Sequence, residues 1–478
     1  MIAGSFLCFL ILFVLIGLAS TFYSKKTEED YLTTGQNTKP WLVALSAVAT
    51  NNSGYMFIGV IGFTYTTGLS SFWVTFGFFF GDYLASLLIH KKLRVKSEEK
   101  KSTSFGQLLS TWQGQNFKKL RIFTGLMTLI FLSIYAAAQF KAGSKALHVL
   151  FNWDYSYGAI IGGIIVLLYC LAGGMRASIW TDAAQSFVMI LSMALLTWTA
   201  VDSLGGIQAV YNKLLSIDPN YLSLTPTSIK GQGFSALALF ILGWICAGFG
   251  VIGQPHIMMR FITLDNPQNM KRARIYYYSW YGVFSLLTIV VGLCARLLIP
   301  EASAFDAELA LPTISKILLP EVLVGLILAG LFAATMSTAD SQVLSCSSAI
   351  SKDILPQKKN NLLFTKMSTV FVAVFSLLIA LYGGTNVFNL VIVAWSILAA
   401  AFAPLITLFV FRFSLTENEC LLISITGVIS TLLWRNFGLS STLAEVGPGL
   451  ASGFIIFGIC QMLKKRLIYK KEGLDIAS

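Results

Sequence analysis

Apolar runs of about 20 residues recur along the whole chain, and each can cross the ~30 Å hydrocarbon core of a bilayer. Of the 478 residues 56% are apolar and only 12% charged, unlike a soluble domain. The first run lacks a basic leader and a cleavage site, so we expect a retained helix rather than a signal peptide. We predict one all-α membrane domain with thirteen spans, at 3–22, 41–63, 71–90, 120–146, 157–173, 179–200, 233–258, 276–299, 321–350, 363–383, 386–411, 418–434 and 444–463.

Two of these spans are interrupted, by ATNNSG at 49–54 and by GFGVIGQP at 248–255. A helix broken inside a bilayer leaves backbone groups unpaired at several kcal/mol each, so the breaks must line a protein cavity. Each break opens a set of five spans, 41–200 and 233–411, and an odd number of spans turns the second set upside down. This order is typical of inverted-repeat secondary transporters. Two C-terminal helices (418–463) and a basic tail (464–478) complete the chain.

The net charge of +12 is distributed unevenly between the two sets of predicted loops. One side holds most of the basic residues, among them Lys91, Lys92, Arg94, Lys271, Arg272, Arg274, Lys464 and Lys465. The positive-inside rule therefore places the N-terminus outside and the C-terminus in the cytoplasm of a cell (inner or plasma) membrane. This pattern indicates a lipid bilayer rather than nucleic acid as the partner of the positive charge.

Several motifs in this order resemble the sodium/solute symporter family, and most closely its sodium/proline branch. They are ALSA at 44–47 with SG at 53–54, WTDAAQ at 180–185, GQPH at 253–256, AATMSTADSQ at 333–342, and 394–404 with AW at its start and FAP at its end. The resemblance implies a LeuT-type five-plus-five inverted repeat. It also implies sodium-driven uptake of a small organic solute.

A sodium site is expected where the first break meets the span at 321–350. Sodium is a hard cation that takes oxygen ligands. By the resemblance, its ligands are the carbonyls of Ala49, Asn52 and Ala334 and the hydroxyls of Ser337 and Thr338. The alternative is that these two hydroxyls bond only to their own helix.

Two carboxylates, Asp182 and Asp340, lie inside or at the edge of spans, where acids are costly and usually functional. Relatives with a further sodium site imply that Asp182, Ser341 and Asp340 hold a second sodium. The alternative for Asp182 is a helix N-cap at the membrane interface.

Two residues depart from the expected pattern. Asn51 is neutral where the sodium/proline branch carries an acid, which weakens the inference of sodium coupling. Lys141 lies within the span at 120–146. It either snorkels to the outer interface with Lys145 or is a bundle-facing amine involved in coupling.

The substrate pocket is expected at mid-membrane between the two breaks and the spans at 120–146 and 386–411. Its candidate residues are Ser53, Gly54, Tyr55, Tyr135, Gln139, Trp244, Phe249, Gln254, Pro255 and Trp395. Half-helix N-termini suit a solute carboxylate, and aromatic rings suit an apolar body. The stretch from Trp244 to Pro255 is about three residues longer than in the proline branch, and Val251 replaces an aromatic residue. A larger amino acid or another small carboxylate therefore remains as plausible as proline.

We find no phosphate loop, catalytic triad or metal-ligand spacing, and so expect a transporter and not an enzyme. Two alternatives remain open. One is a proton-coupled symporter of the same fold, which Asn51 and Lys141 would favour. The other is a nutrient sensor acting through a partner protein. The oligomeric state is not indicated by the sequence.

Overall fold

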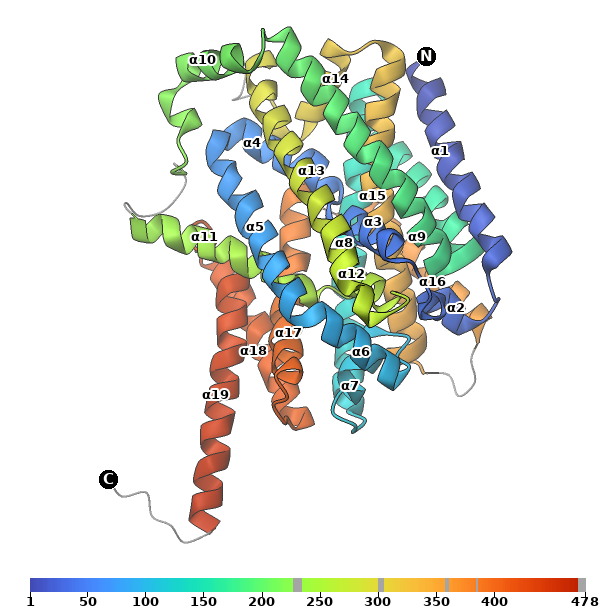
Figure 1. Cartoon of the computed structure of the whole chain (residues 1–478), viewed down its shortest axis with the longest axis vertical. Helices are drawn as coiled ribbons and strands as arrows, with labels where there is room; N and C mark the ends of the chain where they lie inside the picture. Colours follow the sequence, from blue (N-terminus) through green and yellow to red (C-terminus); the bar gives the residue numbers. More distant parts are fainter. Residues whose placement is uncertain (227–233, 300–304, 357–360, 384–385, 472–478) are drawn as a thin grey trace.

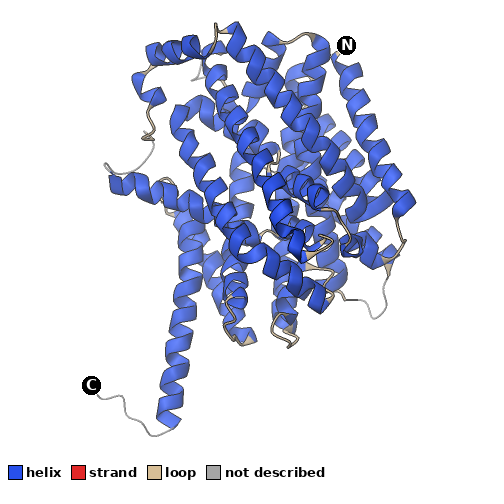
Figure 2. Ribbon diagram, viewed as in Figure 1, coloured by secondary structure: helices blue, strands red, loops and turns tan. Residues whose placement is uncertain are grey.

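The computed structural model describes residues 1–226, 234–299, 305–356, 361–383 and 386–471, and within them the fold is all-helical (Figures 1 and 2). The α-helices begin with α1 (Ile2–Ala19), α2 (Glu28–Thr33), α3 (Pro40–Asn51), α4 (Ile61–Thr67), α5 (Phe72–Ala85), α6 (Lys91–Lys100), α7 (Phe105–Thr111), α8 (Lys118–Phe151), α9 (Tyr155–Ser203) and α10 (Ile207–Ile217). They continue with α11 (Phe234–Phe249), α12 (Pro255–Ile262), α13 (Met270–Leu298), α14 (Ala310–Leu318), α15 (Glu321–Ser348), α16 (Leu362–Tyr382), α17 (Val387–Val410), α18 (Glu417–Asn436) and α19 (Val446–Lys471).

Ten stretches of the described helices have the length and composition of a membrane span. The difference from thirteen has two causes. Tyr155–Ser203 contains two predicted spans, and Tyr55–Lys100 contains the span predicted at 71–90 together with the second half of the one predicted at 41–63, whose first half is α3. In addition, α18 is not among the ten. Inside α9 the backbone leaves the helical conformation at Gly174 (φ 56°, ψ −137°), so this range comprises two helices. The start of α1 and the last described turn of α19 lie at opposite ends of the molecule (Figure 1). The division into two repeats and the side of each terminus stay predictions.

Both predicted interruptions are present. The first helix ends at Asn51, and Asn52 is non-helical (φ −87°, ψ 61°) before the chain resumes in a π-helical turn at Tyr55–Val60 that leads into α4. The second passes from α11 through a 3₁₀ turn (Gly250–Gly253) to an extended Gln254, and α12 then begins at Pro255. Proline suits a first helical position because no N–H is needed there. The GQP sequence therefore restarts the helix as well as breaking it.

Helices α5 and α11 pack with their backbones in contact. A Cβ added at Gly81 would lie 2.0 Å from the Ile245 carbonyl oxygen, and one added at Gly248 would lie 2.0 Å from the Phe78 carbonyl oxygen. Only glycine allows two helix backbones to approach so closely. This contact fixes α5 beside the second interrupted helix.

We expect Gly81→Ala and Gly248→Ala each to destabilise the protein by about 1–3 kcal/mol or more, because the added methyl group meets backbone that cannot rotate away. The thermal unfolding midpoint of the purified protein in detergent measures this effect. Gly4→Ala is the matched control, since nothing lies within 4 Å of a Cβ at that helical glycine. Equal midpoints for all three variants would contradict the close helix contact.

Candidate solute and cation site

The first break and α15 bring together a set of buried oxygen atoms. Ser337 Oγ donates to the carbonyls of Ala49 (3.2 Å) and Ala334 (3.1 Å). Thr338 Oγ1 donates to the carbonyls of Thr50 (2.9 Å) and Ala334 (3.1 Å). The two hydroxyls therefore bond to their own helix and also bridge to α3. Hydrogen bonding within α15 alone does not describe them, and their role as sodium ligands stays a prediction.

Three carbonyl and two hydroxyl oxygens in this group are hard ligands of the kind that an alkali cation takes. Four of the five predicted ligand residues belong to the group, and Thr50 joins them. Asn52, the fifth, lies at the same end of α3. Its side-chain amide donates to the Val48 carbonyl (3.0 Å), and its Oδ1 is buried without a hydrogen-bond partner.

A second group surrounds the guanidinium of Arg260 on α12, which is fully buried. Arg260 Nη2 lies 3.4 Å from Asp182 Oδ2 and 3.3 Å from Asp340 Oδ1. The same nitrogen donates to the hydroxyls of Ser178 and Ser341. These contacts connect the half-helix after the second break to α9 and α15.

This group sets two carboxyl groups against one guanidinium. Both Asp182 Oδ1 and Asp340 Oδ2 are buried without a hydrogen-bond partner. Asp182 is fully buried inside α9 and accepts from Ser46 Oγ (2.6 Å), so its interpretation as an interfacial N-cap is wrong. The predicted set of Asp182, Ser341 and Asp340 is brought together, but with Arg260 among them. Arg260 stands alone among apolar neighbours in its helix, and that signal could have indicated a buried counter-ion.

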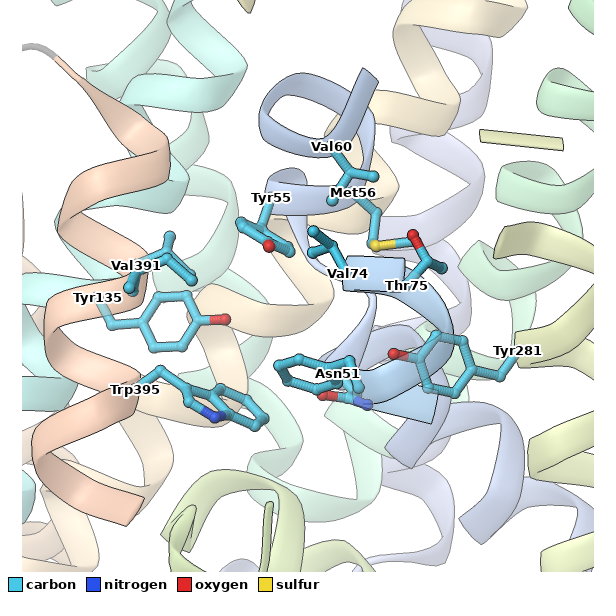
Figure 3. A pocket seen from close by; sticks show the side chains of 12 residues that line it. Asn51, Tyr55, Met56, Val60, Val74, Thr75, Tyr135, Tyr281, Val391 and Trp395 are labelled. Atoms are coloured by element: carbon cyan, nitrogen blue, oxygen red, sulfur yellow. The ribbon is translucent and has the colours of Figure 1, made fainter. Parts of the chain in front are cut away.

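A small cavity of about 20 Å³ lies beside the first break (Figure 3). Its lining residues are Asn51, Tyr55, Met56, Val60, Val74, Thr75, Phe78, Tyr135, Tyr281, Val391, Ile392 and Trp395. About 20 Å³ admits roughly one water molecule and no amino acid, so a solute could bind here only if the lining residues moved apart.

Some predicted pocket residues line this cavity and others support it. Tyr55, Tyr135 and Trp395 are in the lining, and Figure 3 shows them with Asn51 around one space. Behind them, Gly54 N donates to Gln139 Oε1 (3.0 Å), Ser53 Oγ lies 3.5 Å from Tyr135 OH, and Gln254 Nε2 donates to the Trp395 carbonyl (2.9 Å).

Trp244 and Phe249 do not line the cavity. A Cβ at Gly77 would lie 2.8 Å from Trp244 Cβ, and one at Gly81 would lie 2.7 Å from Phe249 N, so both belong to the contact between α5 and α11. Pro255 is not in the lining either, because it is the first residue of α12. These three residues lie outside the lining in this conformation, and their contact with a solute stays a prediction. The lining residues on α5 and Tyr281 on α13 were not predicted, because a hydropathy pattern does not tell which face of a helix meets the site.

The prediction of only two intramembrane acids is also wrong, because Asp82 lies within the predicted span at 71–90. It is fully buried in α5. Its Oδ2 accepts from Asn51 Nδ2 (3.2 Å) and Tyr277 OH (2.8 Å), and its Oδ1 accepts from Tyr278 OH (2.7 Å). The neutral Asn51 therefore has an acid directly beside it. The signal was an aspartate inside the apolar sequence FFFGDYLA at 78–85.

Lys141 contacts the end of α16, and its role in coupling stays a prediction. Its Nζ donates to the Gly383 carbonyl (2.6 Å) at the end of α16, away from both oxygen groups. Lys145, one turn later in α8, pairs with Glu308 (2.6 Å) and Asp306 (2.9 Å).

Four curated or solved proteins are informative for comparison. The chain is 28% identical over 473 residues to the osmoregulated proline transporter OpuE of Bacillus subtilis, covering 95% of this chain and 94% of that protein. It is 27% identical over 480 residues to a sodium/proline symporter of Staphylococcus aureus, covering 95% and 91%. In structure it resembles a Na⁺-coupled sialic acid symporter in a substrate-bound outward-open state (TM-score 0.78, 18% identity, 95% and 97% covered). It also resembles Mhp1, a nucleobase-cation-symport-1 family transporter (TM-score 0.59, 14% identity, 91% and 95% covered).

These likenesses confirm the predicted fold class, an all-α LeuT-type transporter that crosses the membrane many times. The family and the relatives are transporters, in agreement with the apolar helices and the buried oxygen groups. Residues 31–427 match the sequence profile described as the sodium:solute symporter family, and the chain belongs to that family.

Proposed function

We propose that this chain is a sodium-coupled symporter that imports a small organic solute, an amino acid (proline-like) or another small carboxylate, by alternating access. The observation that carries the proposal is the oxygen group formed by Ala49, Thr50, Ala334, Ser337 and Thr338 beside the first break. Two relatives named as proline transporters support the solute class.

Sodium would bind where the two hydroxyls now donate to the carbonyls. Each hydroxyl would then turn its lone pairs to the cation, and α3 and α15 would be held together through the ion. The first break would be fixed in this way, and it carries Tyr55 of the cavity. Each sodium that crosses releases ~2.3 kcal/mol per 100 mV of membrane potential, which can concentrate the solute many-fold.

A second sodium would be held by Asp182, Asp340 and Ser341. The group around Arg260 sets two carboxyl groups against one guanidinium, and two of the carboxyl oxygens have no partner, so with both acids ionised it would favour a cation. A charge left unbalanced in the membrane interior is costly, and one bound sodium would neutralise it.

The solute would be held by Tyr55, Tyr135 and Trp395 in the lining. Ser53, Gly54, Gln139 and Gln254 would shape the two breaks behind them. The longer stretch between Trp244 and Pro255 forms the 3₁₀ turn at Gly250–Gly253, which packs against Ala399 of α17. A solute somewhat different from proline would be the consequence, and the N-terminus would face outside in a cell membrane.

Uptake into proteoliposomes tests the proposal. Purified protein is supplied with labelled amino acids, organic acids and sugars under an imposed sodium gradient, a proton gradient or neither. We expect at least one solute to accumulate only with the sodium gradient. Accumulation that does not depend on the sodium gradient and is abolished by a protonophore would favour proton coupling. Proton coupling is the second candidate because Asn51 is neutral and the acid Asp82 lies beside it.

A further inference from the structure

Asp82 is a buried acid surrounded by neutral donors. Its three hydrogen bonds come from two tyrosine hydroxyls and one amide. In the described part of the chain no Lys, Arg or His forms an ion pair with it, and Arg274 of α13 donates to Ser86 Oγ (3.0 Å), four residues after Asp82. Three donors directed at the two oxygens stabilise the ionised carboxylate. Every neighbour that contacts Asp82 is a donor, so both of its oxygens act as acceptors.

The charge of Asp82 also fixes the orientation of Asn51. The Asn51 amide nitrogen donates to Asp82 Oδ2 (3.2 Å) and to Tyr277 OH (2.7 Å). Turning the amide over would bring its carbonyl oxygen against the carboxylate, which is repulsive. Asn51 Oδ1 must therefore point the other way, and there it is buried and has no hydrogen-bond partner.

Asn51 lines the cavity, where Figure 3 shows it beside Tyr281 and opposite Tyr135 and Trp395. An acceptor in such a site costs free energy unless a donor meets it. The other lining residues are apolar or aromatic apart from Thr75 and the tyrosine hydroxyls, and none of them is a cation. Aromatic faces attract cations, so the cavity as a whole suits a positively charged nitrogen on an apolar body.

We infer that Asn51 Oδ1 receives an N–H of the solute's amine, and that Asp82 is the positioning residue that aims this oxygen. The inference rests on the proposed function and narrows its solute class. The solute is an amine-bearing compound, such as an amino or imino acid, and a carboxylate without nitrogen is a poor substitute.

Matched pairs of solutes test the class. Each amino acid of the uptake panel is paired with its deaminated analogue, for example L-proline with cyclopentanecarboxylate, and N,N-dimethylproline keeps the positive charge but has no N–H. We expect the transported amino acid to compete at least ten-fold better than its deaminated analogue, with the dimethyl compound in between. Equal competition, or sodium-driven uptake of a nitrogen-free solute, would overturn this inference and leave the proposed function intact. No sodium-driven uptake of any solute would count against both.

Variants test the residues. Asp82→Asn should raise the half-saturating amino acid concentration at least ten-fold and reduce the preference over the deaminated analogue, with the half-saturating sodium concentration unchanged. Tyr278→Phe, which removes a donor to Asp82 without touching Asn51, should have a smaller effect than Tyr277→Phe. Should Asp82→Asn fail to fold, Asn51→Ala serves the same purpose, because loss of the acceptor must also remove the preference. A changed sodium requirement with the preference intact would place Asp82 in a cation site and overturn the inference.

Discussion

Arg260→Met is expected to lower the free energy of unfolding by about 3–5 kcal/mol, because it leaves two buried carboxylates without their counter-ion. Arg260, Asp182 and Asp340 are all fully buried, so water cannot replace the guanidinium. Methionine has a similar length and keeps the packing. The thermal unfolding midpoint of the purified protein in detergent should fall sharply, and the expressed protein should be reduced in amount.

The rescue variant separates charge from packing. Arg260→Met combined with Asp182→Asn and Asp340→Asn removes the uncompensated charges, and we expect it to recover much of the lost stability. Lys96→Met is the control, since Lys96 pairs at 2.9 Å with the exposed Glu99, and such pairs contribute about 0–1 kcal/mol. If Arg260→Met unfolds at the same temperature as the parent protein, the ion pairs of Arg260 with Asp182 and Asp340 do not stabilise the fold.

Ser337→Ala combined with Thr338→Ala is expected to raise the half-saturating sodium concentration for uptake at least ten-fold. Each hydroxyl lost from a charged ligand set costs about 1.5–3 kcal/mol, and 1.4 kcal/mol is a factor of ten in affinity. Sodium-dependent uptake in proteoliposomes and sodium-dependent thermal stabilisation of the purified protein both measure this change.

Ser348→Ala is the matched control for this pair. Ser348 is a buried serine of the same helix, but its hydroxyl donates only to the Ser345 carbonyl of α15 (2.9 Å). We expect its sodium dependence to equal that of the parent protein. If the double variant also keeps the parent's sodium dependence, the cation does not bind at this oxygen group.

The parts of the fold that could be predicted follow from local composition. Apolar runs give span lengths, and the Asn, Gly and Pro residues at 49–54 and 248–255 give the two breaks. Gly174 has a backbone conformation that other residues rarely adopt, and it falls between the two spans predicted at 157–173 and 179–200. Ser337, Thr338 and Ala49 could be assigned to one group through the family's motifs, and the structure brings them together.

The parts that could not be predicted depend on which helix faces meet. Asp82 and Asn51 are 31 residues apart, and Tyr277 is 226 residues from Asn51. The spacing of apolar residues within one helix does not indicate which residues of other helices it will contact. Arg260 and its two acids lie on three different helices, and their pairing follows from tertiary packing alone. For the same reason Trp244 was assigned to the pocket although it faces α5, whereas Phe78 of α5 lines the cavity.

The backbone contact between α5 and α11 has a mechanical consequence. Gly81 and Gly248 leave no layer of side chains between the two helices, so we expect the helices to move together. Asp82 follows Gly81 directly and is carried on this body, whereas Asn51 belongs to α3. Any displacement of α11 relative to α3 therefore stretches or shortens the link between Asp82 and Asn51. We therefore expect the affinity of the site for its solute to depend on the position of α11.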